Sequence, residues 1–215
     1  MTVFFLIRHA LHSLGGETIA GRTPEVHLSP DGQAQAAQLA ERLADVPLKA
    51  IYCSPLERTR ETAQPIAEKL GLPVQVCEEL NELDFGEWSG QKLDDLRKLE
   101  KWRQFNSFRS GTRTPNGELM LETQARIICE MERLRERHSN DYIALVSHSD
   151  VIKSAVAYCL GVHLDMFQRI EINPASVSVV AIADYGPLGP LRQQHGRLAA
   201  CVIILSVLLG AYRCG

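Results

Sequence analysis

Three features that often reveal the class of a protein are missing from this chain of 215 residues. No run of Lys or Arg is longer than two residues and the formal net charge is −3, so the basic face that nucleic-acid binding needs is absent. The six cysteines are scattered, without a C-x-x-C pair or a Cys/His pair at zinc spacing. The most apolar stretch, 198–212, is shorter than the roughly 20 residues of a spanning helix. We therefore expect neither nucleic acid nor a membrane as a partner.

The two ends of the chain say little about function. The first apolar run is followed at once by Arg8 and His9, which a signal peptide would not contain. Together with cysteines interpreted as core residues in a reducing compartment, this predicts a cytoplasmic protein. A Gly/Pro cluster after Tyr185 predicts a break in the fold. We expect 186–215 to form a C-terminal tail of unknown role: a packed terminal element, a weak membrane anchor or a segment without a role in activity.

Between the ends, strand-like and helix-like segments alternate. Runs rich in β-branched and aromatic residues predict strands, and apolar residues at helical spacing predict helices. Ser29 and Ser54 are expected to cap two of the helices. The expected strands are 2–7, 49–53, 72–77, 142–147, 168–172 and 176–183, and the expected helices 30–43, 55–70, 118–138 and 150–160. This order predicts a three-layer α/β/α domain over 1–185, with a mostly parallel central sheet and an insertion, 80–117, over the active site.

Two histidines stand at the ends of strand-like runs about 140 residues apart. His9 follows the run Val-Phe-Phe-Leu-Ile-Arg8, and His148 follows Tyr-Ile-Ala-Leu-Val-Ser147. In open α/β sheets, ligands bind outside the carboxyl ends of the strands. The sequence therefore predicts that both imidazoles and the Arg8 guanidinium lie at one edge of one sheet.

A third strand end adds a second arginine. The strand over 49–53 is followed by a predicted helix whose first turn carries Arg58. Helix N-termini attract anions, and arginine adds permanently charged donors that suit phosphate oxygens. Two arginines, two histidines and a helix N-terminus together predict a phosphoryl-binding pocket.

Such a pocket has a plausible chemistry of its own. A neutral imidazole can attack phosphorus, and a covalent phosphohistidine divides one difficult displacement into two easier ones. The charges of Arg8, Arg58 and the second histidine would stabilise the transferring phosphoryl group. The leaving group needs a general acid, and a glutamate partly desolvated near Phe85 and Trp88 would have a suitably raised pKa.

The motifs resemble the histidine phosphatase superfamily, the phosphoglycerate-mutase-like proteins, over residues 3 to about 183. The similar segments are Leu-Ile-Arg8-His9, Leu28-Ser-Pro-Asp-Gly, Ser54-Pro-Leu-Glu-Arg58-Thr-Arg, Leu-Asn-Glu82-Leu-Asp-Phe-Gly-Glu-Trp-Ser-Gly and Leu-Val-Ser-His148. The resemblance implies the same covered α/β sheet and no metal or other cofactor. It also implies roles for individual residues: phosphorylation for His9, proton donation for Glu82, and phosphoryl binding for Arg8, Arg58 and His148. Ser149, beside His148, is expected to join the phosphate-binding group.

The chain departs from the family pattern around these motifs. The residue after the first histidine is usually Gly and here is Ala10, whose Cβ is expected either to narrow the approach to the phosphate or to constrain the backbone. The polar residues usual in the following loop are replaced, so a phosphate ligand would be missing there or would come from His12 or Ser13. The histidines without a strand end before them, His12 included, are otherwise expected at the surface. Asp150 is interpreted as the start of a helix rather than a catalytic group.

These residues predict a phosphatase that hydrolyses small phosphomonoesters through a phosphohistidine, with a small phosphorylated metabolite as its partner. A phosphoglycerate-type mutase on the same scaffold is the first alternative, and a catalytically silent binding protein is the second. The basic residues of 89–117 lack the arginine and tyrosine pattern of a mutase, which favours hydrolysis. The identity of the phosphomonoester and the oligomeric state, a homodimer included, stay open.

Overall fold

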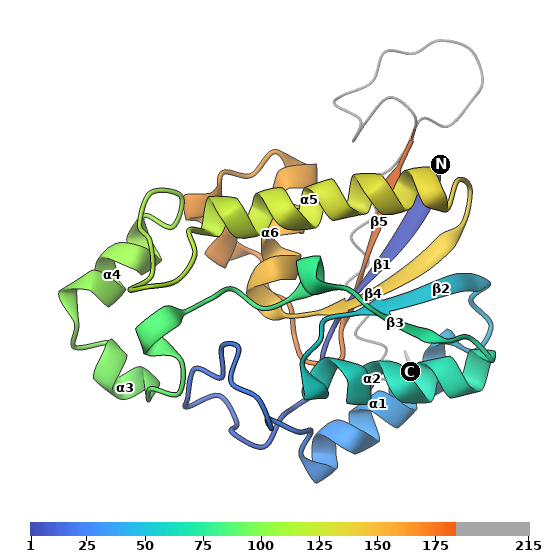
Figure 1. The fold of residues 1–215 in the computed structure, drawn as a ribbon, viewed down its shortest axis with the longest axis horizontal. Helices are drawn as coiled ribbons and strands as arrows, with labels where there is room; N and C mark the ends of the chain where they lie inside the picture. Colours follow the sequence, from blue (N-terminus) through green and yellow to red (C-terminus); the bar gives the residue numbers. More distant parts are fainter. Residues whose placement is uncertain (184–215) are drawn as a thin grey trace, which may run out of the picture.

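The computed structural model describes residues 1–183, which form a three-layer α/β/α sandwich (Figure 1). The central sheet has the strand order β3-β2-β4-β1-β5. The strands are β1 (Thr2–Arg8), β2 (Leu48–Cys53), β3 (Val74–Val76), β4 (Tyr142–Ser147) and β5 (Val177–Ile182). β1 to β4 are parallel, whereas β5 pairs with β1 in the antiparallel direction at one edge. The predicted three-layer fold with a mostly parallel sheet is confirmed.

Helices cover both faces of the sheet. One layer contains α1 (Pro30–Leu43) and α2 (Glu57–Leu70), and the other contains α5 (Met120–Arg137) and α6 (Ser149–Leu160). The helix α1 begins as the sequence predicts, because Ser29 Oγ accepts a hydrogen bond from the Gly32 amide at 3.1 Å. No helix within residues 1–183 has the length and apolarity needed to cross a membrane.

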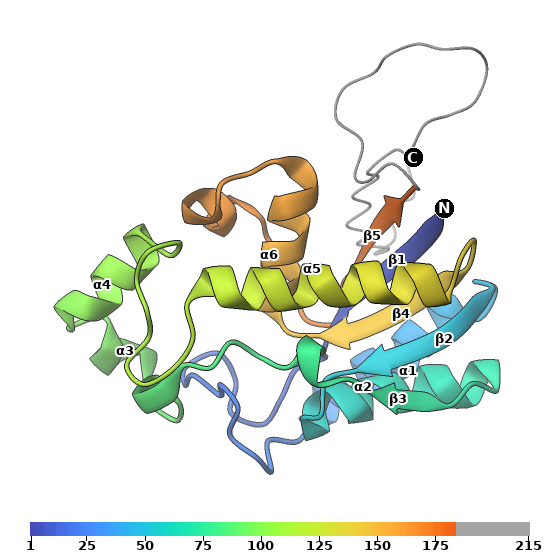
Figure 2. The ribbon, with the colours of Figure 1, turned by 45° about the horizontal axis from the view of Figure 1, so that its top comes forward.

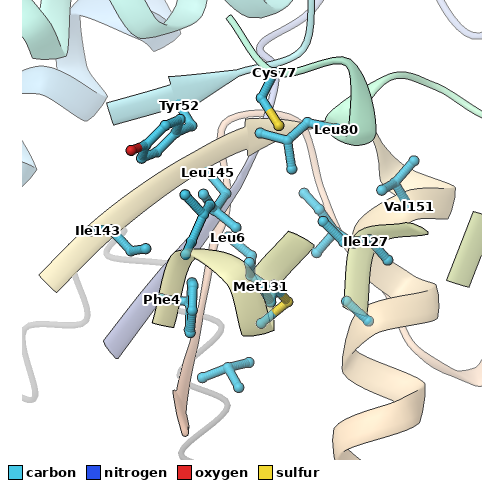
Figure 3. Close-up of a cluster of buried hydrophobic side chains, with 14 of the residues drawn as sticks. Phe4, Leu6, Tyr52, Cys77, Leu80, Ile127, Met131, Ile143, Leu145 and Val151 are labelled. Atoms are coloured by element: carbon cyan, nitrogen blue, oxygen red, sulfur yellow. The ribbon is translucent and has the colours of Figure 1, made fainter. Parts of the chain in front are cut away.

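Each face of the sheet has its own apolar core, because alternate side chains of a strand point to opposite faces. On the α5/α6 face, Phe4 and Leu6 of β1 pack with Met131 of α5 (Figure 3). On the α1/α2 face, Ile7 packs with Leu39 and Ile66. All six side chains are at most 1% exposed. The strands are thus buried on both sides, which explains their nearly continuous apolar sequences.

Two short helices of the insertion, α3 (Leu93–Leu96) and α4 (Glu100–Ser107), lie apart from the sandwich, toward the carboxyl ends of β1, β2 and β4 (Figure 2). A third apolar cluster joins them to the rest, with Trp88, Phe105 and Phe167 at its centre. Trp88 is 3% exposed, and its ring contacts those of Trp102 and Phe105.

Two local predictions are wrong. Residues 168–172 do not form a strand, because the 3-10 helix η3 (Leu164–Arg169) buries Phe167 completely and the chain then continues without regular structure. Ser54 does not cap α2, which begins at Glu57 after Leu56. Instead, Ser54 Oγ bonds to His148 Nε2 at 2.8 Å. The predicted domain end at 185 and the apolar tail lie outside the described residues.

Candidate active site

The strands β1 and β4 bring the two predicted histidines together. Arg8 is paired in register with Ser147, and the His9 amide donates to the Ser147 carbonyl at 2.9 Å. The next residue of each strand end is therefore a histidine, and the ring centroids of His9 and His148 are 5.2 Å apart. Neighbouring parallel strands account for this meeting of residues that are far apart in the chain.

A pocket of about 480 Å³ opens over these strand ends. Five of the six predicted site residues line it: Arg8, His9, Arg58, Glu82 and Ser149. The sixth, His148, does not line it and is fully buried beneath. The structure thus places the six side chains in one region, at the carboxyl ends of the strands.

His9 has the protonation expected of a nucleophile. Its Nδ1 lies 2.8 Å from the Ala10 carbonyl oxygen, which can only accept, so Nδ1 carries the proton and Nε2 keeps its lone pair. Burial, followed by the charge of Arg58, lowers the pKa of His9 well below its ordinary value. The ring is therefore neutral at physiological pH, with Nε2 available to attack.

Each of the two arginines has at least one N–H donor without a hydrogen-bond partner among residues 1–183. Arg8 Nη1 donates to the Ile172 carbonyl at 2.6 Å, and Arg58 Nη2 donates to the Gly21 carbonyl at 2.7 Å. Within residues 1–183, however, Arg8 Nε and both Arg58 Nε and Nη1 are buried without a hydrogen-bond partner. Buried donors without partners are costly in a folded protein. An anion with several acceptor oxygens would satisfy these donors.

His148 connects the second arginine to the sheet. Its Nδ1 lies 3.3 Å from Arg58 Nη2, and its Nε2 lies 2.8 Å from Ser54 Oγ. Since guanidinium only donates, Nδ1 accepts and the proton is on Nε2. Burial and then Arg58 lower the pKa of His148 well below its ordinary value, so this ring is neutral too. A contact to a phosphoryl group would require His148 to exchange one of these bonds.

Glu82 has the properties of a general acid. Its side chain is 13% exposed, and its Oε2 lies 3.7 Å from His148 Nδ1. Burial, and next the negative charge of Asp150, raise the pKa of Glu82 to about 7, although Arg58 opposes the change. A carboxyl group with that pKa can donate a proton near neutral pH and accept one in a later step.

An ion pair that local sequence patterns do not reveal closes one side of the pocket. Arg109, 4% exposed, donates from Nη1 to Asp150 Oδ2 at 2.7 Å and from Nη2 to Asn106 Oδ1 at 2.8 Å. Its guanidinium also lies over the rings of Phe105 and Phe167, at 4.3 and 4.7 Å from their centroids. Asp150 starts a helix as expected, but it also lines the pocket, and its negative charge raises the pKa of Glu82.

The expected effect of Ala10 on the pocket is not found. Ala10 is completely buried in the core of the α1/α2 face and is not a lining residue of the pocket. Its amide donates to Thr62 Oγ1 at 3.0 Å, and its φ is not positive. The Cβ thus points into the core cluster, so an alanine fits here without narrowing the approach to His9.

The prediction that His12 lies at the surface is wrong. His12 lines the pocket, with its ring centroid 5.5 Å from that of His9. Its neighbours in the loop, Gly15, Gly16 and Thr18, line the pocket as well. The sequence offered His12 only as one possible source of a phosphate ligand, because its position depends on how the loop after β1 folds back over the strand ends.

The ligand atoms of Cys77, Glu79 and Glu130 lie within 4.8 Å of one another, the one such cluster among residues 1–183. None of these residues lines the pocket. Arg133 donates to both Glu130 carboxylate oxygens, at 2.6 and 2.7 Å. This arginine already neutralises the carboxylate that a cation would need.

Comparison with known proteins shows the family of this chain. A sequence model of the histidine phosphatase superfamily (branch 1) matches residues 4–189. The chain belongs to this family. A histidine phosphatase relative from Hydrogenobacter thermophilus, phosphoserine phosphatase 1, is 32% identical over 186 residues, covering 84% of this chain and 86% of its own. A protein of Escherichia coli named "Probable phosphoglycerate mutase GpmB" is 29% identical and covers 84% and 85%.

Solved structures of histidine phosphatases share the fold. Phosphoserine phosphatase from Entamoeba histolytica, in complex with 3-phosphoglyceric acid, has a TM-score of 0.77 and 26% identity, covering 85% of this chain and 91% of its own. Alpha-ribazole phosphatase from Shigella flexneri has a TM-score of 0.76 and 27% identity, with the same coverage. The family predicted from the motifs is confirmed.

Proposed function

We propose that this histidine phosphatase hydrolyses a small phosphomonoester through a phosphohistidine at His9. The observation that carries the proposal is the set of complementary groups in one pocket. A neutral His9 with a free Nε2 faces arginine donors without partners and a glutamic acid whose pKa is about 7. These are the nucleophile, the anion clamp and the proton donor of phosphoryl transfer.

In the first step, Arg8 and Arg58 bind the phosphoryl oxygens and His9 Nε2 attacks phosphorus. The bond from phosphorus to the ester oxygen breaks as the bond to Nε2 forms. Glu82 gives its proton to the departing alkoxide, and the alcohol leaves. The neutral state of His9 matters here, because a protonated imidazole has no lone pair on Nε2.

In the second step, the Glu82 carboxylate takes a proton from water, whose oxygen attacks phosphorus. The bond from phosphorus to Nε2 breaks, inorganic phosphate leaves, and His9 and protonated Glu82 are restored. The same carboxyl group thus acts as acid and then as base, for which a pKa near the working pH is best. His148 would hold Arg58 through Nδ1, and the Ser149 amide at the N-terminus of α6 would add a donor.

The pocket wall formed by the insertion supports a small and polar leaving group. Arg97 and Asn106 line it with polar groups, and Trp102 and Phe85 add apolar surface. Gln168 of η3 adds a further polar group to the pocket. The relatives named above include phosphatases of phosphoserine and of alpha-ribazole phosphate, and one of them was solved with 3-phosphoglyceric acid. We therefore place phosphoserine, 3-phosphoglycerate and alpha-ribazole phosphate first among the candidate substrates.

The experiment is a hydrolysis screen with phosphorylated metabolites and an aryl phosphate, comparing the natural chain with a His9→Ala variant. We expect release of inorganic phosphate from at least one small monoester, and its loss in the variant. Unchanged turnover in His9→Ala would refute the mechanism. No turnover of any monoester would favour the silent binding protein.

The mutase alternative has the GpmB relative in its favour. Its test is the conversion of 3- to 2-phosphoglycerate primed by a bisphosphate. Hydrolysis predicts release of inorganic phosphate without isomerisation, because water can reach the phosphohistidine. Primed isomerisation faster than hydrolysis would assign the chain to the mutases.

A further inference from the structure

His12 is a polar residue of the pocket that the mechanism above leaves unused. The loop after β1 fixes its position: its backbone forms an antiparallel bridge with Leu28, and its carbonyl accepts from the Gly15 amide at 3.1 Å. The next amide, of Ser13, donates to the His27 carbonyl at 2.9 Å. His12 is thus held by backbone hydrogen bonds on the same pocket wall as His9, Arg8 and Arg58.

The two ring nitrogens of His12 have different surroundings. Nδ1 is buried and has no hydrogen-bond partner among residues 1–183, whereas Nε2 is not a buried atom of that kind. A buried acceptor without a partner is tolerated better than a buried N–H without one. The proton therefore belongs on Nε2, and His12 lines the pocket.

We propose that His12 is a third imidazole of the phosphoryl site, which donates a hydrogen bond from Nε2 to a phosphoryl oxygen. The inference rests on the proposed function, because it assigns a further ligand to the same phosphate. It is supported by the position of His12, which lines the pocket together with Arg8, His9 and Arg58 and whose ring centroid lies 5.5 Å from that of His9.

The electrostatics of the pocket agree with a neutral donor. Burial, and then the charges of Arg58 and Arg8, lower the pKa of His12 to about 4. An uncharged N–H can approach the two guanidinium groups without repelling them. His12 would therefore add a hydrogen bond to the anion clamp without adding a charge to it.

The test uses three variants that separate the donor from the ring. His12→Gln places an amide N–H near the position of Nε2, His12→Asn places one near Nδ1, and His12→Phe keeps a ring against His9 without any donor. The dissociation constant of inorganic phosphate is measured for each full-length variant by calorimetry, with kcat and KM for an aryl phosphate. Thermal unfolding midpoints check that each variant is folded.

We expect His12→Asn and His12→Phe to weaken phosphate binding about 10-fold or more, the size expected for one hydrogen bond to a charged group, and His12→Gln to stay within about 3-fold of the natural chain. Equal phosphate affinity in His12→Asn and the natural chain would overturn the inference, as would equal weakening in His12→Gln and His12→Phe. A natural chain that neither binds phosphate nor hydrolyses any monoester would overturn the proposed function itself. A natural chain that does both while the variants bind equally well would overturn only the role of His12.

Discussion

Burial decides which groups of the pocket carry a proton. It lowers the pKa of His9 and His148 and raises that of Glu82 to about 7, so near neutral pH the imidazoles are uncharged while the carboxyl group can be protonated. The positive charge of Arg58 reinforces the effect on both histidines. The nucleophile and the acid are therefore ready in the same pH range, which is what the proposed first step requires.

Replacing Glu82 by Gln should affect substrates according to their leaving groups. The variant cannot protonate the departing oxygen, so we expect kcat/KM for an alkyl phosphate to fall by roughly 10²–10⁴-fold. An aryl phosphate leaves as a weakly basic phenolate and should lose much less. Values of kcat/KM for the two ester types give the comparison, since this ratio covers only the steps up to phosphorylation of His9. An equal loss for both types would contradict the role of Glu82 as acid.

Asp150→Asn should move the pH profile. Asp150 raises the pKa of Glu82, so removing its charge lowers that pKa. The first step needs protonated Glu82, and kcat/KM therefore falls as the pH rises through this pKa. The alkaline limb, near pH 7 in the natural chain, should move to lower pH in the variant, as measured from kcat/KM against pH. Asp95→Asn, which removes an exposed carboxylate paired with Lys98, should leave the limb in place.

The residues of the site differed in how far the sequence revealed them. Arg8, His9 and His148 could be chosen because each directly ends or follows a strand, and Arg58 because it opens a helix after one. The contacts of His12 and of the Arg109–Asp150 pair depend on loops that meet only in the folded chain. The sequence marked His12 only as one possible phosphate ligand and Asp150 only as the start of a helix, and no periodicity or turn signal marked Arg109.

Among the helices and strands, the bounds were predicted best for strands that are buried on both faces and for a helix whose N-cap residue is its direct neighbour in the chain. The strands β1 and β4 and the helix α1 agree with their expected ranges within a residue or two. In a short apolar run, the spacing of the apolar residues does not distinguish a strand from a helical turn. Residues 168–172 were predicted as a strand for that reason, although 164–169 form a 3-10 helix. Ser54 failed as a cap because its hydroxyl bonds to His148, a partner 94 residues away.

Residues 82–88, which include Glu82, pack closely against residues 114–118 at Gly86. Gly86 has a φ of +54°, and a Cβ there would lie 1.9 Å from the Pro115 carbonyl oxygen. Its neighbour Asp84 accepts through its carbonyl from the Glu118 amide at 2.9 Å and from Thr114 Oγ1 at 2.8 Å. This crossing fixes the approach of residues 82–88 to the pocket.

Gly86→Ala should therefore destabilise the protein more than Gly90→Ala. Gly90 also has a positive φ, +78°, but a Cβ there would meet nothing within 4 Å. We expect Gly90→Ala to cost about 1–2 kcal/mol from the left-handed backbone alone. Gly86→Ala adds a clash with backbone and should cost more, and it should also reduce kcat by displacing Glu82. Urea unfolding and steady-state kinetics test both effects; equal free energies of unfolding in the two variants would contradict the account of this crossing.

For the whole molecule, a covered parallel sheet supplies the rigid half of the site and the insertion supplies the other. The strand ends position His9, His148 and the arginine clamp. The helices α3 and α4, which lie toward these strand ends (Figure 2), supply the lining residues Leu93, Trp102 and Asn106. The sheet was predictable from patterns of burial. The shape of the insertion wall was not, because long-range packing around Phe105 and Phe167 sets it.

The most direct test of the account is to trap the enzyme during turnover of a ³²P-labelled monoester and to locate the label. The account predicts phosphate on Nε2 of His9, stable in base, labile in acid and absent from the His9→Ala variant. Label on a serine, a threonine or an aspartate, or turnover without any labelled enzyme, would contradict it.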